Sequence, residues 1–435
     1  MMELIGDTPL VEVPQSVHGL ENVQIFAKLE LMNPFGSIKD RIARELLEDD
    51  FALLHEQRRT VIENSSGNTA KAMQALCSVH DVGFRTVTNR IKLTDQRDLL
   101  LLLGADVHEL PGTSDCHDPT DPNDPLICIE REVAASNGQL HHTSQYTNPA
   151  NLQAHHRTGD EIVKDLGHID MFVGGLGTTG STRGVAERLI ACNPEVAIHG
   201  VVASSGDHIP GIRTADELFE VGLFDRSLYA SIIEMSSLSA IDGMVLLARG
   251  VGIMAGPTAG ATFMALIEHL RPLPRSTGDP LRAVFLACDR IEPYMQYIRD
   301  RRPDLVGRSA KPDGFAAHVA QPSELETALI SIEDLQDRMH VGACTVIDTR
   351  GALAYRTAHI PGAMNVTDEF VERMLDMGTL VDETASVVFV CPVGRKSARY
   401  ATYLRRKGIE AYSLAGGITA WRDGGRPMHV AAKQP

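Results

Sequence analysis

Features that would place a protein in a membrane or on nucleic acid are missing from this chain of 435 residues. The longest apolar run is too short to cross a bilayer, and no signal-peptide pattern opens the sequence. Positively charged residues are fewer than negatively charged ones: the chain has 41 Lys and Arg and 57 Asp and Glu, so its net charge is −16. We therefore expect neither a membrane nor a nucleic acid as a partner.

The cysteines lack the pairing that extracellular and zinc-binding proteins display. There are seven, an odd number, and no two of them form a CxxC motif. Both a disulfide framework and a zinc site are therefore disfavoured, and free thiols are typical of a reducing compartment. We expect a cytoplasmic protein without a metal site.

Strand-like and helix-like stretches alternate along residues 1–305, which indicates an α/β domain with a largely parallel sheet. Residues 306–324 are polar and contain Pro and Gly, as linkers do. Residues 325–435 alternate again and are long enough for a small domain of their own. The expected elements of the first domain include strands at Val23–Leu29 and Thr60–Glu63 and helices at 40–54 and 69–80.

One lysine has neighbours that suit a covalently held cofactor. Lys39 lies in the run Asn33–Arg41 (NPFGSIKDR), in which Asn-Pro and Gly-Ser are turn signals, and apolar residues at helical spacing follow. We expect it at a loop-to-helix junction, where backbone N–H groups are free to bind an anion. A lysine amine can hold an aldehyde cofactor as a Schiff base. The alternative is an ordinary exposed lysine.

Two further loops offer donors for anions. Glu63–Ala70 (ENSSGNTA) brings hydroxyl groups, a glycine and an asparagine to the start of a helix, which suits a carboxylate, although a plain N-cap has the same pattern. Gly174–Gly184 (GGLGTTGSTRG) follows an apolar strand and precedes a helix, which suits a phosphate or a structural turn. Its glycine spacing matches neither a Walker loop nor the dinucleotide fingerprint.

These runs occur in an order that resembles the cysteine synthase/cystathionine β-synthase family of pyridoxal-phosphate enzymes. The resemblance covers about residues 3–298 and implies a two-subdomain fold like that of the tryptophan synthase β subunit. It also implies a homodimer that acts on a small amino-acid substrate. The matching runs are Ile5–Leu10, Asn33–Arg41, Ser65–Thr69, Gln145–His155, Gly177–Ser181, Val251–Gly256 and Asp289–Met295.

The resemblance implies a role for each motif residue. Lys39 would hold pyridoxal 5'-phosphate and later move the α-proton of the substrate, and Asn68 would bind the ring hydroxyl of the cofactor. The cofactor's phosphate would be held by Gly177, Thr178, Thr179, Gly180 and Ser181. The substrate carboxylate would be held by Ser65, Ser66, Thr69 and Gln145.

Several positions depart from the family pattern, among them Phe35 beside the lysine and Ala70 in place of a glycine. Arg290 stands where a small hydroxyl residue commonly faces the pyridine nitrogen, and an arginine cannot accept a proton from that nitrogen. A register shifted by one residue would bring Asp289 or Cys288 there instead. Thr179 replaces a usual glycine of the phosphate loop.

Cys391 directly follows the apolar stretch Val387–Val390. A short loop separates it from a helix expected at 395–407. A cysteine beside loop N–H donors and positive side chains favours a nucleophilic thiolate, whereas the alternative is a buried structural cysteine. The surrounding motifs, Val346–Arg350, His359–Ala363 and Leu414–Trp421, resemble those of a single-domain rhodanese.

In that family the cysteine accepts sulfane sulfur as a persulfide, and the loop after it holds the anion. The matching loop residues here are Pro392, Val393, Gly394, Arg395, Lys396 and Ser397, with Lys396 in place of a commonly seen arginine. The loop has the sulfurtransferase length, because a phosphatase variant would need a longer one.

The two resemblances together suggest a fused enzyme. An O-activated serine, O-acetylserine or O-phosphoserine, would pass through aminoacrylate to cysteine or a related β-substituted alanine, with sulfur supplied by a sulfur donor through Cys391. The alternative is a non-sulfide nucleophile, or cysteine as the substrate, with the rhodanese domain relaying or sensing sulfur.

Overall fold

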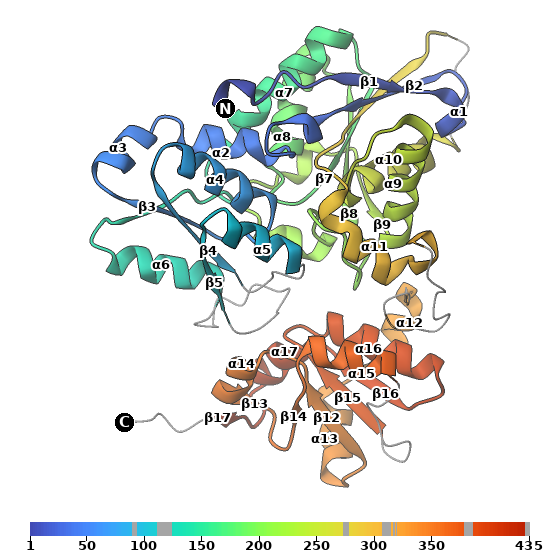
Figure 1. Cartoon of the computed structure of the whole chain (residues 1–435). Helices are drawn as coiled ribbons and strands as arrows, with labels where there is room; N and C mark the ends of the chain where they lie inside the picture. The colour runs from blue at the N-terminus through green and yellow to red at the C-terminus, as the bar shows by residue number, and fades with distance from the viewer. Residues whose placement is uncertain are drawn as a thin grey trace. The chain divides into compact units, whose positions relative to one another are not determined.

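The computed structural model describes residues 1–88, 94–110, 124–272, 278–306, 315, 318, 320–377 and 386–430. The chain forms two compact units (Figure 1). The first consists of Met1–His108 and Ile129–Leu305, and the second of Glu109–Cys128 and Val306–Pro435. Within the described residues, no helix is both long and apolar enough to span a bilayer.

A six-stranded sheet forms the centre of the first unit. It has the order β1-β2-β10-β7-β8-β9, and all neighbouring strands are parallel except β1 and β2. Parallel strands are covered on both faces and therefore consist of continuous apolar residues. The strands are β1 (Leu10–Val13), β2 (Val23–Lys28), β7 (Met171–Gly175), β8 (Ala197–Ala203), β9 (Ser231–Met235) and β10 (Leu281–Leu286).

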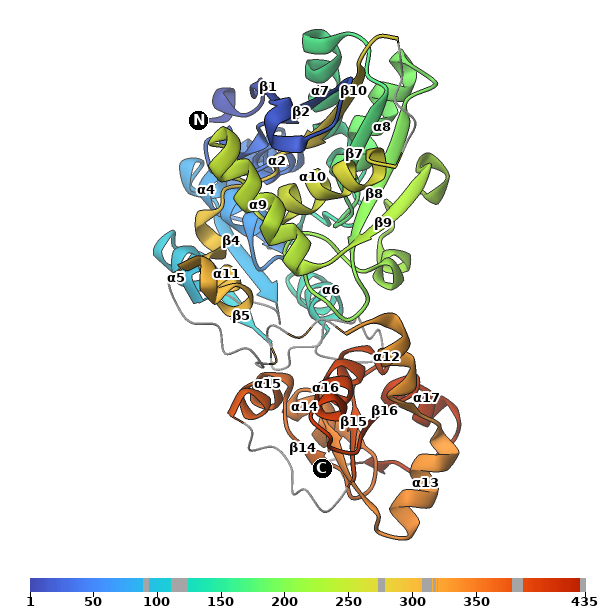
Figure 2. The same ribbon diagram turned by 90° about the vertical axis from the view of Figure 1, so that its right-hand side faces the viewer.

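Each face of this sheet packs on its own pair of helices. Alternate residues along a strand point to opposite faces, so Phe172 joins the cluster with α7 and α8, whereas Val173 joins the cluster with α9 and α10. Figure 2 places α9 and α10 on one side of β7 and β8. The four helices are α7 (Ala150–Leu166), α8 (Gly180–Cys192), α9 (Ser237–Val251) and α10 (Pro257–Leu270).

A four-stranded sheet of order β5-β4-β3-β6 completes the first unit. Its core is formed by apolar residues of α2, α3 and α4 that pack on β3 and β4. The strands are β3 (Thr60–Glu63), β4 (Gly83–Thr88), β5 (Asp106–Glu109) and β6 (Leu140–His142). The helices around both sheets are α1 (Gln15–His18), α2 (Lys39–Leu47), α3 (Phe51–Glu56), α4 (Asn68–Val79), α5 (Thr94–Leu102), α6 (Pro125–Ala135) and α11 (Met295–Arg301).

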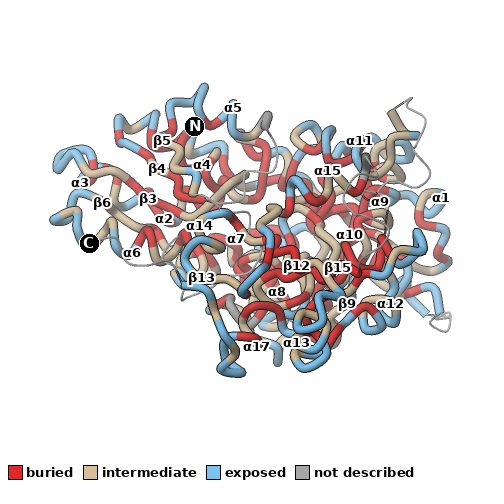
Figure 3. Tube along the Cα trace, turned by 90° about the horizontal axis from the view of Figure 1, so that it is seen from below, coloured by how far each residue is buried: buried red, intermediate tan, exposed pale blue. Residues whose placement is uncertain are grey.

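The second unit contains a parallel five-stranded sheet of order β11-β16-β15-β12-β14 and a short antiparallel pair, β13 and β17. Figure 3 shows β12 and β15 largely buried. The strands are β11 (Leu329–Ile330), β12 (Cys344–Asp348), β13 (Ala358–His359), β14 (Met364–Asn365), β15 (Ser386–Val390), β16 (Ala411–Leu414) and β17 (His429–Val430). The helices are α12 (Pro322–Thr327), α13 (Ile332–His340), α14 (Ala352–Thr357), α15 (Asp368–Met377), α16 (Arg395–Arg406) and α17 (Gly417–Asp423).

The segment expected as a linker is partly built into the second unit. Part of this segment lies outside the described residues, namely 307–314, 316, 317 and 319. Phe315, however, is only 3% exposed and packs against Tyr400 and Tyr403. An aromatic side chain buried in this way belongs to the core of the second unit.

Candidate active site

Lys39 is the first residue of α2, directly after a loop that one carboxylate closes. Asp40 accepts hydrogen bonds from Phe35 N at 2.6 Å and from Ser37 Oγ at 3.2 Å. The Lys39 backbone N–H donates to the same Ser37 Oγ at 3.2 Å. The loop-to-helix junction expected for Lys39 is therefore present, and the two residues that flank the lysine, Ile38 and Asp40, are buried.

The surroundings of Lys39 favour its free amine. Burial lowers the pKa of Lys39, and this effect is only partly opposed by the nearby Cys288 and Asp289. An amine of lowered pKa is deprotonated more often and can then attack an aldehyde.

A buried cluster of ion pairs anchors the helix that carries Lys39. Arg41 Nε lies 2.7 Å from Glu30 Oε2, and Arg41 Nη2 lies 2.8 Å from Glu161 Oε2. Lys28 Nζ lies 2.8 Å from the same Glu161 oxygen, and all four side chains are at most 9% exposed. The sequence analysis missed this cluster, because Glu161 is 120 residues from Arg41 in the chain. Its only signal in the sequence was Arg41, a charged residue two positions after the lysine.

The residues expected to hold the substrate carboxylate come together at the start of α4. Thr69 Oγ1 donates to Gln145 Oε1 at 3.0 Å, and Gln145 Nε2 donates to the Asn64 carbonyl at 2.8 Å. Ser65 Oγ instead accepts from Ala70 N at 3.1 Å and so caps the helix. Ser66 lies in the same loop and is partly buried.

Asn68, the first residue of α4, faces the segment that follows β10. Its Nδ2 donates to Asp289 Oδ2 at 2.7 Å, and the Tyr294 hydroxyl donates to the same oxygen. Burial raises the pKa of Asp289 to about 6, against the effect of these hydrogen bonds.

The orientation of Arg290 differs from that of the preceding Asp289. Its side chain is exposed and lies against Gly36, and its Nε donates to the Leu31 carbonyl at 3.1 Å. Successive side chains of an extended segment point in opposite directions, so Asp289 points inward and Arg290 outward. The contact of Arg290 with the pyridine nitrogen stays a prediction, and the exposed side chain favours the shifted register, in which Cys288 and Asp289 are the neighbours of Lys39.

The loop between β7 and α8 has unused polar groups. The hydroxyl of Thr179 is buried and has no hydrogen-bond partner in the described part of the chain, although Asn151 Nδ2 donates to Thr178 Oγ1 at 3.2 Å. A Cβ atom at Gly177 would collide with the Gly211 carbonyl oxygen, and one at Gly180 would collide with the Asn151 side chain. Backbone N–H groups at a helix start, an unpaired hydroxyl and close backbone packing fit a phosphate. Ser181 follows in the first turn and is partly buried.

Thr179 also carries backbone strain, because its φ is +62°, in the left-handed region. We expect Thr179→Gly to leave the cofactor-free protein at least as stable as wild type while weakening cofactor binding about tenfold, the effect of one lost hydrogen bond to a charged group. Thr179→Ala is the matched control, since it loses the hydroxyl and keeps the strain. Thermal unfolding and cofactor titration measure the two effects, and unchanged cofactor affinity in both variants would contradict a phosphate contact.

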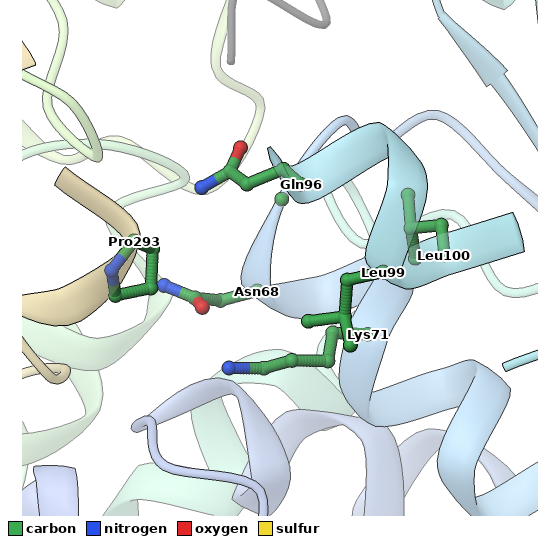
Figure 4. A pocket seen from close by; sticks show the side chains of 7 residues that line it. Asn68, Lys71, Gln96, Leu99, Leu100 and Pro293 are labelled. Atoms are coloured by element: carbon green, nitrogen blue, oxygen red, sulfur yellow. The ribbon is translucent and has the colours of Figure 1, made fainter. Parts of the chain in front are cut away.

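A cavity of about 120 Å³ opens beside Asn68. Figure 4 shows Asn68 and Lys71 reaching from α4 toward the segment of Pro293, with side chains of α5 opposite them. The lining residues are Gly67, Asn68, Lys71, Gln96, Leu99, Leu100 and Pro293. The cavity is mainly apolar at α5 and polar at α4, as small-molecule sites commonly are.

In the second unit, Cys391 lies at the end of β15, where the sequence analysis expected it. Its Sγ is held by Gly394 N at 3.2 Å and by Ser397 Oγ at 3.1 Å, and the residue is 2% exposed. Ser397 Oγ also lies 2.7 Å from Ser413 Oγ. Two donors are therefore directed at one sulfur. Pro392 and Val393 lie in the loop between, partly buried.

The two cations expected at this loop are the first residues of α16. Arg395 and Lys396 are both partly buried. Lys396 Nζ lies 3.0 Å from Asp368 Oδ2 and 3.6 Å from Glu372 Oε1 on α15. Its charge is therefore balanced by acids of the neighbouring helix, which the loop pattern alone did not indicate.

The matches to known families follow the same division of the chain. Residues 1–289 match the model of the family described as pyridoxal-phosphate dependent enzyme. The chain belongs to this family. Residues 331–423 match the rhodanese-like domain, so the pyridoxal-phosphate enzyme carries a rhodanese domain at its C-terminal side.

Relatives place the first unit among enzymes of the cysteine synthase type. A cysteine synthase from Aquifex aeolicus is 30% identical over 304 residues, 68% of this chain and 90% of the relative. An N-(2-amino-2-carboxyethyl)-L-glutamate synthase from Ralstonia nicotianae is 33% identical over 336 residues, 74% and 96% of the two chains. The structure of a hydrogen sulfide-producing enzyme from Fusobacterium nucleatum, 28% identical, matches 68% of this chain and 97% of its own with a TM-score of 0.59. The chain is thus a cysteine synthase-like enzyme that uses pyridoxal phosphate on a small-molecule substrate.

Proposed function

We propose that the enzyme performs β-replacement on O-acetylserine or O-phosphoserine and makes cysteine or a related β-substituted alanine, with sulfur delivered through Cys391. The observation that carries this proposal is that one unit contains a lysine of lowered pKa and two candidate anion sites. These are Lys39, the Thr69–Gln145 pair and the loop with the unpaired Thr179 hydroxyl.

The residues of the first unit divide the work. When bound, pyridoxal phosphate supplies the electron sink that makes the α-proton acidic and lets the β-substituent leave. The Gly177–Ser181 loop would hold its phosphate, and Thr69, Gln145 and the Ser65–Ser66 loop would hold the substrate carboxylate. Lys39 Nζ then takes the α-proton and returns it after the nucleophile has added at the β-carbon. The burial around Lys39 limits the access of water to that exchange.

The sulfur step would use the second unit. The Cys391 thiolate attacks the outer sulfur of thiosulfate, the S–S bond breaks and sulfite leaves, so Cys391 carries a persulfide. Two molecules of a small thiol then reduce the terminal sulfur to sulfide and are themselves oxidised to a disulfide. Covalent linkage of the two units raises the local concentration of sulfide donor near the first site.

The experiment is cysteine formation from O-acetylserine with either sulfide or thiosulfate plus dithiothreitol. We expect Cys391→Ser to keep the sulfide-supported rate and to lose the thiosulfate-supported rate by at least about 100-fold, since the nucleophile is gone. Cys344→Ser is the matched control, because Cys344 is a free thiol at the start of the adjacent strand β12. Equal thiosulfate use by wild type and Cys391→Ser would refute the relay.

A second candidate function uses a different nucleophile or cysteine itself as the substrate. It is favoured by the 33% identity to a relative whose name gives glutamate as part of the product, and by the likeness to a hydrogen sulfide-producing enzyme. In this case the rhodanese domain relays or senses the sulfur. Offering O-acetylserine, O-phosphoserine and cysteine in turn, each with sulfide or L-glutamate, separates the candidates by their products.

We also propose a cytoplasmic homodimer. The free thiols of the described residues include Cys77, Cys192, Cys288, Cys344 and Cys391, as a reducing compartment keeps them. Leu101 and Leu102 at the end of α5 are 45% and 82% exposed, and Met254 is 57% exposed, so the first unit has apolar surface for a second copy. Sedimentation of the full chain at micromolar concentration tests the dimer, and a single monomeric species would contradict it.

A further inference from the structure

Asp289 lies between two polar side chains that it holds with a single oxygen. Its Oδ2 accepts from Asn68 Nδ2 at 2.7 Å and from the Tyr294 hydroxyl, and the residue is 7% exposed. The three side chains come from two different segments, the start of α4 and the turn after β10. The carboxylate therefore ties the residue that opens α4 to the segment that follows the central sheet.

This arrangement is costly for the fold alone. The second oxygen, Oδ1, is buried and has no hydrogen-bond partner among the described residues. The fold makes room for it at Gly256, where a Cβ atom would collide with Oδ1. The cations that act on this carboxylate are Lys71 and Lys39. A buried carboxylate with an unsatisfied oxygen destabilises a protein, so its presence beside Lys39 points to a role in the site.

The hydrogen bonds also fix which way the Asn68 amide points. A primary amide has two N–H bonds on one nitrogen and an oxygen on the other side. One N–H of Asn68 is taken by Asp289, and the contact to the Tyr294 hydroxyl, at 3.4 Å, is too long to hold the other firmly. A carboxylate cannot accept from an amide oxygen, so Asp289 prevents the amide from turning over. In Figure 4 the Asn68 nitrogen points toward the segment of Pro293, which lies between Asp289 and Tyr294 in the chain.

We propose that Asp289 is a positioning residue that keeps the second N–H of Asn68 directed at the ring oxygen of pyridoxal phosphate, and that its negative charge favours the protonated form of the linkage to Lys39. The first part rests on the proposed role of Asn68. Without Asp289 the amide loses the partner that fixes its orientation and can present its oxygen to the ring oxygen, and two acceptors repel. Without the negative charge of Asp289, the protonated linkage at Lys39 would lose a nearby anion that stabilises it.

A double-mutant cycle on cofactor binding tests the proposal, using Asp289→Ala, Asn68→Ala and the double variant. Cofactor affinity is measured by titrating the cofactor-free protein, and the protonated form by the ratio of visible to near-ultraviolet absorbance of the bound cofactor. We expect each single variant to bind about tenfold more weakly and the double variant to bind no more weakly than Asn68→Ala, because Asp289 contributes to affinity through Asn68 and its charge acts on the spectrum. Asp289→Ala should also lower the visible fraction.

Two further variants keep the result interpretable. Asp289→Asn retains an acceptor for Asn68 without the charge, so it should recover most of the affinity but not the visible fraction. Tyr294→Phe removes a hydroxyl from the same carboxylate and should change affinity less than about twofold. Additive losses in the double variant, or an unchanged spectrum in both Asp289 variants, would overturn the proposal. If Asn68→Ala alone binds the cofactor normally, the proposed cofactor contact of Asn68 fails instead.

Discussion

Lys39→Ala is expected to abolish the yellow colour of the loaded enzyme and to lower the rate of β-replacement by at least about 1,000-fold. The variant loses the amine that holds the cofactor and moves the α-proton, and a positioned proton-transfer group alone contributes roughly 100- to 10,000-fold. The measurements are the absorbance of the purified protein with added pyridoxal phosphate and product formation from O-acetylserine and sulfide.

Lys71→Ala is a matched control for this prediction. Lys71 is also a largely enclosed lysine, burial lowers its pKa too, and it interacts with Asp289 as Lys39 does. It lies one turn into α4, however, and not at the end of a loop. Reduction of the loaded wild-type enzyme with borohydride should attach the cofactor to the peptide of Lys39. A modified Lys71 peptide, or colour that survives in Lys39→Ala and is lost in Lys71→Ala, would reverse the assignment.

Much of the fold follows from local sequence patterns. The strand expected at Thr60–Glu63 has those bounds in the structure, and the helix expected at 69–80 is α4, Asn68–Val79. Both have apolar patterns with clear ends, which local rules predict well. The helix expected at 40–54 is divided into α2 and α3, with a turn at residues 48–50. The turn brings Phe51 and Leu54 into the same core as Leu47, a requirement of packing that periodicity does not contain.

The site was predicted as a set of motifs, and the structure supplies their orientation. The pairing of Thr69 with Gln145 joins residues that are 76 positions apart. The resemblance to the family predicted that both residues hold the same substrate group, but no local sequence rule predicts the contact between them. Side-chain direction was harder, because a shift of one residue in an extended segment exchanges inside and outside. Arg290 and Asp289 differ in that way, because Arg290 is exposed and Asp289 is buried.

We expect the largest effect on stability from a substitution in the buried ion cluster of Lys28, Glu30, Arg41 and Glu161. Glu161→Gln removes the anion that Arg41 and Lys28 share, leaving two buried cations with Glu30 alone. Breaking a buried pair typically costs about 3–5 kcal/mol, since the remaining charge stays buried. We expect a loss of this size in the free energy of unfolding of the first unit, measured by urea denaturation. Glu187→Gln is the control, because Glu187 pairs with Arg183 and His156 at a half-exposed site and should cost less than about 1 kcal/mol.

The same carboxylate predicts how the difference depends on pH. Burial would raise the pKa of Glu161, but hydrogen bonds and charge from Arg41 and Lys28 outweigh it and lower the pKa from 4.5 to about 2. A carboxyl group whose pKa is lower in the folded than in the unfolded protein contributes its stability above the unfolded value and loses it as pH falls toward the folded value. The stability gap between wild type and Glu161→Gln should therefore be full above about pH 4.5 and shrink toward pH 2. A gap that stays constant over this range would mean that Glu161 acts by packing and not by charge. Because Arg41 is two residues after Lys39, a loss by charge would also loosen the start of α2, and Glu161→Gln should then bind pyridoxal phosphate more weakly at neutral pH.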